Sequence, residues 1–478
     1  MTSGPSLTVL SVTSECVPFV KTGGLADVAG ALPAAVAPQG VAMRTLLPGY
    51  PAVLEALGKA EQKPVQVARW DSLFGGAARL FAAQLEGRDM LVLDAPHLFT
   101  RDGTLYLGPD GQDWPDNDRR FAALSWVAAQ IGAHGIEGWK PFVLHLHDWQ
   151  AGLTPAYLHA MGASGACGTL MTIHNIAFQG LTPASQMHAL QLPGELFSAE
   201  GFEYWGQISA LKAGLVFADR ISTVSPTYAR ELLTPEFGTG LDGVLRARAG
   251  DVCGILNGID KQAWAPPFKS QRGKASRVAA LRKEAGLPDS AGPLCVVISR
   301  LSAQKGLDVL LSALPALLAR GGQLMLLGSG DPDLEDGFRA AAQDHAGVSV
   351  RIGYNEPLSR RMMAGAEAVL VPSRFEPCGL TQLYGLHHGA VPVVARTGGL
   401  ADTVIDANAA ALRAGVATGI HFAPVTAEAL AHAFQRLCDL YDAGAPFRAM
   451  QRAGMKADVG WESSAEEYAR LYAEIAKP

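Results

Sequence analysis

Short runs of apolar, mostly β-branched residues alternate with longer Ala- and Leu-rich stretches along almost the whole chain. This order is typical of parallel sheets whose strands are joined by crossover helices. In the first half the expected strands are Leu7–Val12, Met90–Leu93, Phe142–His147, Thr169–His174 and Arg220–Val224, and the expected helices include Arg119–Gly132 and Ala151–Ala160. The sequence therefore predicts an α/β protein of the doubly wound kind.

The alternation is interrupted by a proline-bearing, basic and polar stretch at Ala265–Arg277, which we interpret as a linker between domains. After it the alternation restarts, with expected strands Leu294–Ser299, Gln323–Leu327, Val348–Gly353, Ala368–Val371 and Pro392–Ala395. A chain of 478 residues is too long for a single core. We therefore expect two Rossmann-like domains, residues 1–264 and 265–457, facing a deep cleft, which is a common ligand site.

Composition excludes several classes of protein. The net charge of −6 gives no electrostatic footprint for nucleic acid or an anionic membrane. The six cysteines form no Cys-x-x-Cys pair, which argues against a disulfide framework or a structural zinc site and suits a reducing cytoplasm. Residues 1–5 contain no basic segment, so we expect no signal peptide, and no apolar run reaches the roughly 18 residues of a membrane span.

Two loops of the second half carry charged groups beside expected helix starts. In Val371–Gln382 a strand leads through Glu376 to Gly379–Thr381, whose N–H groups could bind an anion. The alternative is an ordinary turn with a surface carboxylate. Arg300 and Lys305 follow another strand, and together they suit a diphosphate leaving group whose charge grows in the transition state. They could equally be two solvated loop cations.

A glycine-rich loop follows the first expected strand. Gly23 and Gly24 allow close backbone approach to a phosphate, and Lys21 supplies a compact positive charge. The residue order is not that of a Walker A loop. A glycine turn that simply starts a helix is the structural alternative.

Polar residues also end two neighbouring strands of the first half. His145, His147 and Asp148 resemble a metal cluster, but strand alternation puts both histidines on one face with no further ligand in evidence. We prefer a polar strand end in which Asp148 holds sugar hydroxyls. His174 and Asn175 leave a buried strand where a pocket would open, although a satisfied structural histidine is the alternative.

Two further positions have competing interpretations. Asp116–Asp118 has the Asp-x-Asp pattern of metal-dependent glycosyltransferases, but it opens an expected helix, so N-capping by Asp116 explains it better and we predict no metal. Tyr354 follows another expected strand and could stack on a base or cap the core.

Taken together, these motifs resemble the bacterial and plant starch/glycogen synthase family, and the resemblance runs from Val9 to the C-terminal helix. The pieces that carry it are Lys21–Leu25, His147–Trp149, His174–Asn175, Lys212–Gly214, Thr223–Tyr228, Leu256–Asp260, Arg300–Leu301, Gln304–Leu307, Ser373–Gln382 and Thr397–Thr403. Gln150 and His387–His388 depart from the residues expected in close relatives. Both lie beside the motifs and are expected to tune activity.

The resemblance implies the GT-B arrangement and transfer of glucose from ADP-glucose to the non-reducing end of an α-1,4-glucan, with retention of anomeric configuration and no metal or cofactor. It also implies that residues 458–478 form a helix that crosses back to the first domain. The apolar spacing of Trp461, Tyr468, Leu471 and Tyr472 alone would fit a terminal helix on the second domain equally well.

Site roles carried over from the family fall into three groups. The catalytic residues would be His174, Asp148, Arg300, Lys305 and Glu376, with Glu376 on the glucose hydroxyls. The donor would be bound by Lys21, Gly23, Gly24, Arg300, Lys305, Tyr354, Cys378, Gly379, Leu380 and Thr381, with Tyr354 stacked on adenine. The acceptor would meet Asp27, Asn175 and Asn257, with Asp148 on the same side. UDP-glucose or another acceptor remains an alternative, as does a catalytically silent glucan-binding protein.

Overall fold

The structure is a computed structural model that describes residues 7–477; residues 1–6, on which the signal-peptide expectation rests, lie outside this range. The chain divides into two compact units. Unit 1 comprises Met1–Val224, Ala229–Ile255 and Trp461–Pro478, and unit 2 comprises Ser225–Tyr228 and Leu256–Gly460. Unit 2 therefore begins before the expected boundary at residue 265. Ile259 explains the difference, because it packs with Leu383 and Val459 in unit 2.

Unit 1 is built on a nine-stranded sheet of order β12-β11-β7-β6-β1-β2-β5-β4-β3. Its strands are β1 (Leu7–Val12), β2 (Val41–Pro48), β3 (Val65–Leu73), β4 (Gly76–Leu85), β5 (Arg88–Asp94), β6 (Val143–His147), β7 (Gly168–Ile173), β11 (Arg220–Thr223) and β12 (Val252–Gly254). All neighbours pair in parallel except β5–β4 and β4–β3, which form an antiparallel extension. The strand order reverses between β1 and β6, which is where doubly wound sheets bind ligands.

The helices of unit 1 cover this sheet. A small second sheet is formed by the segment between β7 and β11. The helices are α1 (Gly24–Val36), α2 (Pro51–Gly58), α3 (Pro96–Phe99), α4 (Asn117–His134), α5 (Asp148–Ala151), α6 (Thr154–Ala160), α7 (Ala210–Phe217), α9 (Asp242–Ala247) and α19 (Glu462–Ile475). The three-stranded sheet has the order β8 (Leu181–Pro183), β10 (Gln207–Ser209), β9 (Glu203–Tyr204), and α8 (Pro226–Glu231) begins in unit 2.

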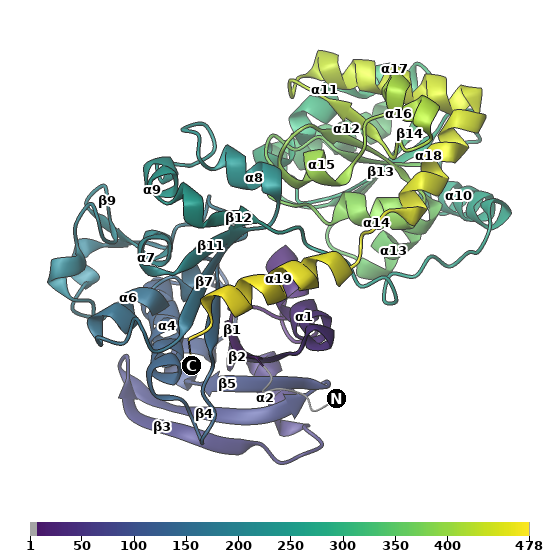
Figure 1. Ribbon diagram of the computed structural model, residues 1–478. Helices are drawn as coiled ribbons and strands as arrows, with labels where there is room; N and C mark the ends of the chain where they lie inside the picture. The colour runs from purple at the N-terminus through teal and green to yellow at the C-terminus, as the bar shows by residue number, and fades with distance from the viewer. Residues whose placement is uncertain (1–6, 478) are drawn as a thin grey trace. The chain divides into compact units, whose positions relative to one another are not determined.

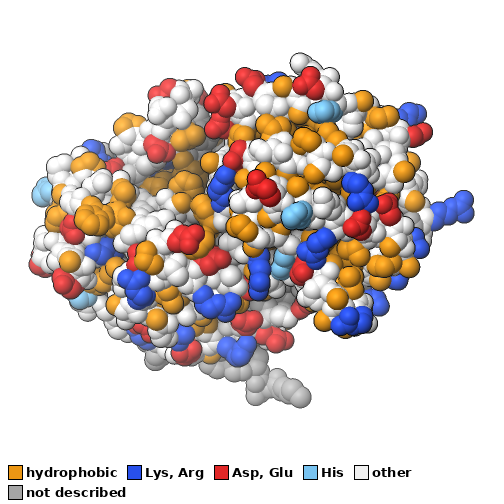
Figure 2. All heavy atoms as spheres, turned by 90° about the horizontal axis from the view of Figure 1, so that it is seen from above, with side chains coloured by type: hydrophobic (Ala, Val, Ile, Leu, Met, Phe, Trp, Pro, Cys, Tyr) orange, Lys and Arg blue, Asp and Glu red, His pale blue; other side chains and the backbone are white. Residues whose placement is uncertain are grey.

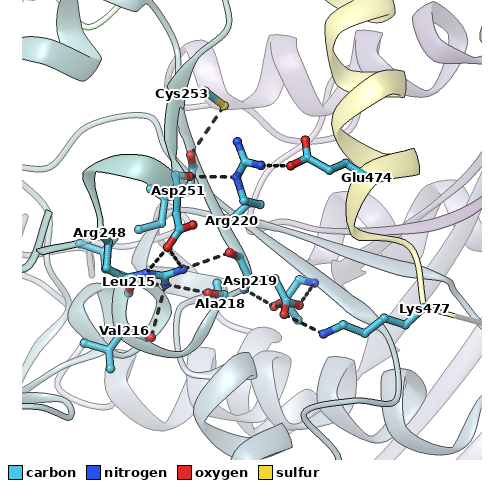
Figure 3. Close-up of polar contacts among 12 residues, drawn as sticks. Leu215, Val216, Ala218, Asp219, Arg220, Arg248, Asp251, Cys253, Glu474 and Lys477 are labelled. Atoms are coloured by element: carbon cyan, nitrogen blue, oxygen red, sulfur yellow. Dashed lines mark hydrogen bonds and ion pairs between the residues drawn. The ribbon is translucent and has the colours of Figure 1, made fainter.

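The C-terminal helix α19 belongs to unit 1. Figure 1 shows it beside α1, and its apolar side, including Tyr468 and Tyr472, is buried against Val9 and Leu170 of the sheet. Figure 3 shows the polar contacts at its end: Glu474 pairs with Arg220, and Lys477 Nζ lies 2.7 Å from Asp219 Oδ1. Burying each of these large side chains contributes about 1.5–3 kcal/mol, so packing outweighs the exposed ion pairs.

Unit 2 contains a six-stranded parallel sheet of order β15-β14-β13-β16-β17-β18. The strands are β13 (Leu294–Ile298), β14 (Gln323–Gly328), β15 (Val348–Ile352), β16 (Ala368–Val371), β17 (Val391–Ala395) and β18 (Ile420–Phe422). Numbered within the unit, this is the 3-2-1-4-5-6 order of dinucleotide-binding folds. The order reverses between β13 and β16.

Helices cover both faces of this second sheet. They are α10 (Gln271–Ala285), α11 (Leu307–Leu318), α12 (Pro332–Asp344), α13 (Glu356–Gly365), α14 (Thr381–His387), α15 (Gly398–Thr403), α16 (Ala409–Ala414), α17 (Ala427–Ala443) and α18 (Ala445–Lys456). Alternate residues of β13 divide between two cores: Val297 packs on the side of α11 and α17, and Val296 on the side of α10 and α13. This period of two is why the strands are apolar throughout.

Two expectations about local structure are wrong. The expected linker Ala265–Arg277 is irregular only at its start, because α10 begins at Gln271 and Ser270 Oγ caps it by accepting from Gly273 N at 3.2 Å. The expected helix Ala151–Ala160 is broken into α5 and α6. Pro155 lies in the first turn of α6 and has no N–H to donate to Ala151, which favours a new helix start at this position over continuation of α5.

The surface carries mixed charge. On the face shown in Figure 2, Lys and Arg side chains are interspersed with Asp and Glu. Among residues 7–477, no helix combines the length and the apolar character needed to cross a membrane.

Candidate active site

Several of the candidate residues follow the strands between which the strand order reverses in each sheet. In unit 1, Lys21 follows β1 and Asp148 follows β6, and these strands are hydrogen-bonded neighbours. In unit 2, Lys305 follows β13 and Glu376 follows β16, which are also neighbours. Because parallel strands end at the same edge, residues distant in sequence are brought together there.

Glu15 holds the glycine-rich loop of unit 1. Its carboxylate is 3% exposed; Oε2 accepts from Thr22 N at 2.5 Å and Gly23 N at 3.1 Å, and Oε1 accepts from Thr22 Oγ1 at 2.8 Å. Tyr106 OH donates to Oε1 at 3.1 Å. The motifs did not single out Glu15. A buried carboxylate between a strand end and a glycine loop is nevertheless a recognisable signal, because it can accept hydrogen bonds from the N–H groups of the loop.

The loop itself leaves room beside Gly23. A Cβ added at Gly23 would meet no atom within 4 Å, and Gly24 is the first residue of α1. Lys21 Nζ lies 2.7 Å from Asp27 Oδ1, so a residue expected at the donor is paired with one expected at the acceptor. Their side chains are 41% and 24% exposed, and an anion could therefore compete for Lys21.

Asp148 fixes the turn that carries His174. It has a left-handed backbone conformation (φ 54°), which is costly for a residue with a Cβ and is typical of functional sites. Its Oδ1 accepts from His174 N at 2.7 Å and from Asn175 N at 3.3 Å. Burial raises the pKa of Asp148 to about 7, and these two hydrogen bonds oppose the rise. Asp148 thus binds the backbone at the end of the next strand.

Two histidines meet at this edge. His174 Nε2 lies 2.9 Å from His147 Nδ1, and burial lowers the pKa of His174 to about 3. Burial also lowers the pKa of His147 well below its ordinary value. Both rings are therefore neutral near pH 7. His174 is only partly buried, whereas His147 is fully enclosed.

In unit 2, Lys305 and Glu376 form an ion pair. Lys305 Nζ lies 2.5 Å from Glu376 Oε2, and Ser373 Oγ donates to the same oxygen at 2.8 Å. The two charged side chains are 19% and 9% exposed, so the pair is largely removed from water. Arg300 is exposed at the end of β13, so Lys305 is held by Glu376 while Arg300 faces solvent.

The glycines after Glu376 pack against a second glycine-bearing loop. Gly379 has φ +74°, and a Cβ at Gly398 would lie 2.0 Å from Glu376 O, so neither position tolerates a side chain. Gly399 N donates to Glu376 O at 3.1 Å, and Gln382 Nε2 donates to Gly379 O at 2.8 Å. These contacts fix the main chain that carries Glu376.

The remaining candidates of unit 2 present main-chain or exposed groups. Burial raises the pKa of Cys378 to about 12, so its thiol stays neutral. Leu380 precedes α14 and Thr381 is its first residue. Tyr354 is 79% exposed after β15. Asn257 is 8% exposed, and its Oδ1 has no hydrogen-bond partner within the described range.

The expectation that the Asp116 side chain caps a helix is wrong. Asp116 occupies the N-cap position of α4, but its side chain makes no capping bond. Arg101 takes both carboxylate oxygens instead, at 2.7 and 3.0 Å. A bidentate pair with a guanidinium is stronger than a bond to one backbone N–H, so the ion pair wins.

Comparisons with known proteins agree along the whole chain. The starch synthase catalytic domain model matches residues 8–247, and the model for glycosyl transferases group 1 matches residues 292–439. The chain is 64% identical to a glycogen synthase of Paracoccus denitrificans, over 98% of this chain and 99% of that protein. It is 56% identical to a glycogen synthase of Roseobacter denitrificans, over 97% and 98%.

Solved structures give the same result. The catalytic domain of starch synthase IV from Arabidopsis thaliana, bound to ADP and acarbose, superposes with a TM-score of 0.84 at 29% identity, covering 98% of this chain and 99% of that one. A sucrose-phosphate synthase from Thermosynechococcus elongatus, at 19% identity and a TM-score of 0.60 over 98% of each chain, shares the fold alone. The family, the glucosyltransferase class and the GT-B fold expected from the motifs are confirmed: the chain belongs to the glycogen synthase family of starch synthase-type glycosyltransferases.

Proposed function

We propose that this chain transfers glucose from ADP-glucose to the non-reducing end of an α-1,4-glucan, retains the anomeric configuration and releases ADP. The observation that carries the proposal is the largely buried Lys305–Glu376 pair at the strand-order reversal of unit 2. It joins a cation suited to a diphosphate with a carboxylate suited to sugar hydroxyls. Similarity to a starch synthase solved with ADP supports adenine as the base.

In unit 2, we assign the donor to the residues around this pair. Arg300 and Lys305 would bind the diphosphate, and Glu376 would hold the glucose hydroxyls while Ser373 supports it. The main chain of Cys378, Gly379, Leu380 and Thr381 would donate to phosphate oxygens, and the exposed ring of Tyr354 would stack on adenine. Charge that develops on the leaving diphosphate would then meet preorganised cations.

In unit 1, Lys21 would contact the donor phosphates, and the open space beside Gly23, which precedes Gly24 at the start of α1, would admit them. His174 would lie beside the reacting carbon, at a position that Asp148 fixes through the backbone. For the acceptor we propose Asp27 and Asn175, together with Asn257 of unit 2, whose buried Oδ1 has no hydrogen-bond partner among the described residues.

The proposed reaction is a front-face displacement through an oxocarbenium-like state. The bond between the anomeric carbon and the diphosphate oxygen breaks, and the acceptor hydroxyl attacks from the same side. Its proton passes to the leaving phosphate oxygen. Retaining hydrolases instead use two carboxylates about 5–5.5 Å apart, one as a nucleophile. Glu376 is held by Lys305 and Ser373, which suits a binding carboxylate better than a nucleophile.

We also propose a cytoplasmic location, which the six unpaired cysteine thiols support. The proposal predicts glucose incorporation into glycogen from labelled ADP-glucose, much faster than from UDP-glucose, with EDTA present throughout. Transfer from UDP-glucose but not from ADP-glucose would make UDP-glucose the donor instead. Glycogen binding without transfer from either donor would favour the glucan-binding alternative.

A further inference from the structure

We propose that Ser11 and His147 form a buried hydrogen-bond relay that fixes His174 in the tautomer with its proton on Nδ1, so that His174 presents a hydrogen-bond donor at its open nitrogen. Ser11 and His147 are then positioning residues that act through His174. The catalytic consequence rests on the function proposed above, whereas the tautomer itself does not.

The relay follows from the sheet. Ser11 lies on β1 and His147 ends β6, its neighbour, and His174 follows β7, the next strand. Ser11 Oγ lies 3.1 Å from His147 Nε2, and His147 Nδ1 lies 2.9 Å from His174 Nε2. Ser11 and His147 are both 0% exposed. Three consecutive groups therefore run from the core to the edge of the sheet.

Proton counting limits the relay to two arrangements. Burial keeps both imidazoles neutral, as their lowered pKa values indicate, so each ring carries one N–H. The His147–His174 contact contains one proton. Either His147 Nδ1–H donates to His174 Nε2, or His174 Nε2–H donates to His147 Nδ1. Only the first leaves the proton of His174 on Nδ1.

Ser11 decides between these arrangements. Within residues 7–477, its hydroxyl hydrogen-bonds to His147 Nε2 and to no other group. If His147 donated to Ser11, the serine proton would be buried without an acceptor, which is the costly state for a hydroxyl. If Ser11 donates, every group of the relay is satisfied. His147 Nε2 is then an acceptor, and its proton must lie on Nδ1, facing His174.

His145 does not compete for these contacts. Its ring lies 4.1 Å from that of His147, centroid to centroid, but its nitrogens are bonded elsewhere. Nε2 lies 2.6 Å from Thr172 Oγ1, and Nδ1 lies 2.8 Å from Tyr472 OH on α19. This second network packs against the relay through the His145 ring.

The relay gives His174 a hydrogen-bond donor at a fixed nitrogen. His174 Nε2 is occupied by His147, and the backbone N–H of His174 is occupied by Asp148. Nδ1 is the remaining nitrogen of this partly exposed ring. A neutral N–H there would donate to a sugar hydroxyl or to an oxygen that gains charge in the transition state. It could not act as a general base.

The tautomer can be read directly. Protein labelled with ¹⁵N-histidine is examined by long-range ¹H–¹⁵N correlation, and His174→Asn identifies the signals of His174. We expect Nδ1 of His174 to be protonated and Nε2 to be unprotonated. A protonated Nε2 overturns the proposal. In Ser11→Ala the serine proton is gone, and we expect a measurable population of the opposite tautomer; an unchanged spectrum also overturns it. Neither result depends on enzyme activity.

Kinetics then test the catalytic consequence. His147→Asn places an amide N–H where Nδ1 was and can still donate to His174, whereas His147→Asp places an acceptor there and reverses the tautomer. With thermal unfolding as a folding check, we expect kcat to fall about tenfold or less in His147→Asn and about a hundredfold in His147→Asp. Equal losses overturn the proposal.

Ser11→Ala, expected to lower kcat about tenfold, keeps the test valid if His147→Asp does not fold. A wild-type chain without transfer would defeat the proposed function and leave the tautomer result standing.

Discussion

Lys305 Nζ and Glu376 Oε2 lie 2.5 Å apart although 71 residues separate them in the chain. The two strands that precede them, β13 and β16, are neighbours across the point where the sheet order reverses. Both charged side chains are too buried for water to solvate them fully. Removing either one therefore leaves the other charge buried without its counter-ion. The pair thus joins the loop proposed to bind the diphosphate to the loop proposed to bind the sugar.

Replacement of either partner is expected to abolish most turnover. We expect Lys305→Ala or Glu376→Ala to lower kcat for glucose transfer by about two to four decades, because each removes charge that acts in the transition state. Initial rates at saturating ADP-glucose measure the effect. Asp308→Asn is the matched control: it breaks the exposed Arg374–Asp308 pair nearby, and kcat is expected to stay within about threefold. An unchanged rate in both alanine variants would remove the pair from the site.

Glu15→Gln tests the support of the glycine-rich loop. The amide nitrogen cannot accept hydrogen bonds, so the variant loses half of the acceptors that hold Thr22 and Gly23. We expect the KM for ADP-glucose to rise about tenfold, since each lost bond to a charged group is worth about 1.5–3 kcal/mol and the loop can relax. Steady-state kinetics provide the measurement. Tyr106→Phe removes a separate hydrogen bond to the same carboxylate and leaves the loop contacts in place, so it should have a smaller effect; the reverse order would contradict the account.

Asp148 is expected to act through the backbone of the next turn. In Asp148→Ala, the His174 and Asn175 N–H groups lose their acceptor, and we expect unit 1 to lose about 1–3 kcal/mol of stability per unsatisfied group. Asp148→Asn keeps one oxygen and should cost less. Urea unfolding monitored by circular dichroism distinguishes the two. Equal destabilisation would show that the oxygen does not hold the turn.

The buried histidines predict acid sensitivity. Burial lowers the pKa values of both His145 and His174 from 6.5 to about 3. The unfolded chain therefore binds protons below pH 6.5 that the folded chain does not. Stability that is fully present above pH 6.5 is lost progressively as the pH falls toward 3, by about 1.4 kcal/mol per pH unit for each histidine.

His145→Gln isolates one of these protons. We expect the pH dependence of the unfolding free energy between about pH 6 and 4 to become shallower by one proton relative to the wild type. The comparison cancels the contribution of carboxylates, which both proteins share. A slope that does not change would mean that His145 titrates alike in the folded and unfolded chain.

Much of the fold was predictable because the parallel strands are buried on both faces. β1 and β16 have the expected bounds, since their apolar runs end at polar or turn residues. The antiparallel extension of β3 and β4 was missed, because these strands mix exposed and buried residues without clear alternation. The start of α10 resembles a linker in sequence because its first turns are polar and basic.

The side-chain partners in the site could not be predicted. The motifs identify Lys21, Lys305 and Glu376, but local sequence does not contain the distance between loops that follow different strands. The Lys305–Glu376 contact requires the order of the sheet, and the support of Thr22 by Glu15 requires the conformation of the loop. Likewise, the bond from Tyr472 to His145 depends on where α19 packs.

The most direct test measures ADP release and the incorporation of labelled glucose into glycogen in the same reaction, with ADP-glucose as donor and EDTA present. The account predicts one ADP released for each glucose added to the glucan, and loss of both signals in Lys305→Ala. ADP release accompanied by free glucose, or no reaction with any glucan acceptor, would contradict it.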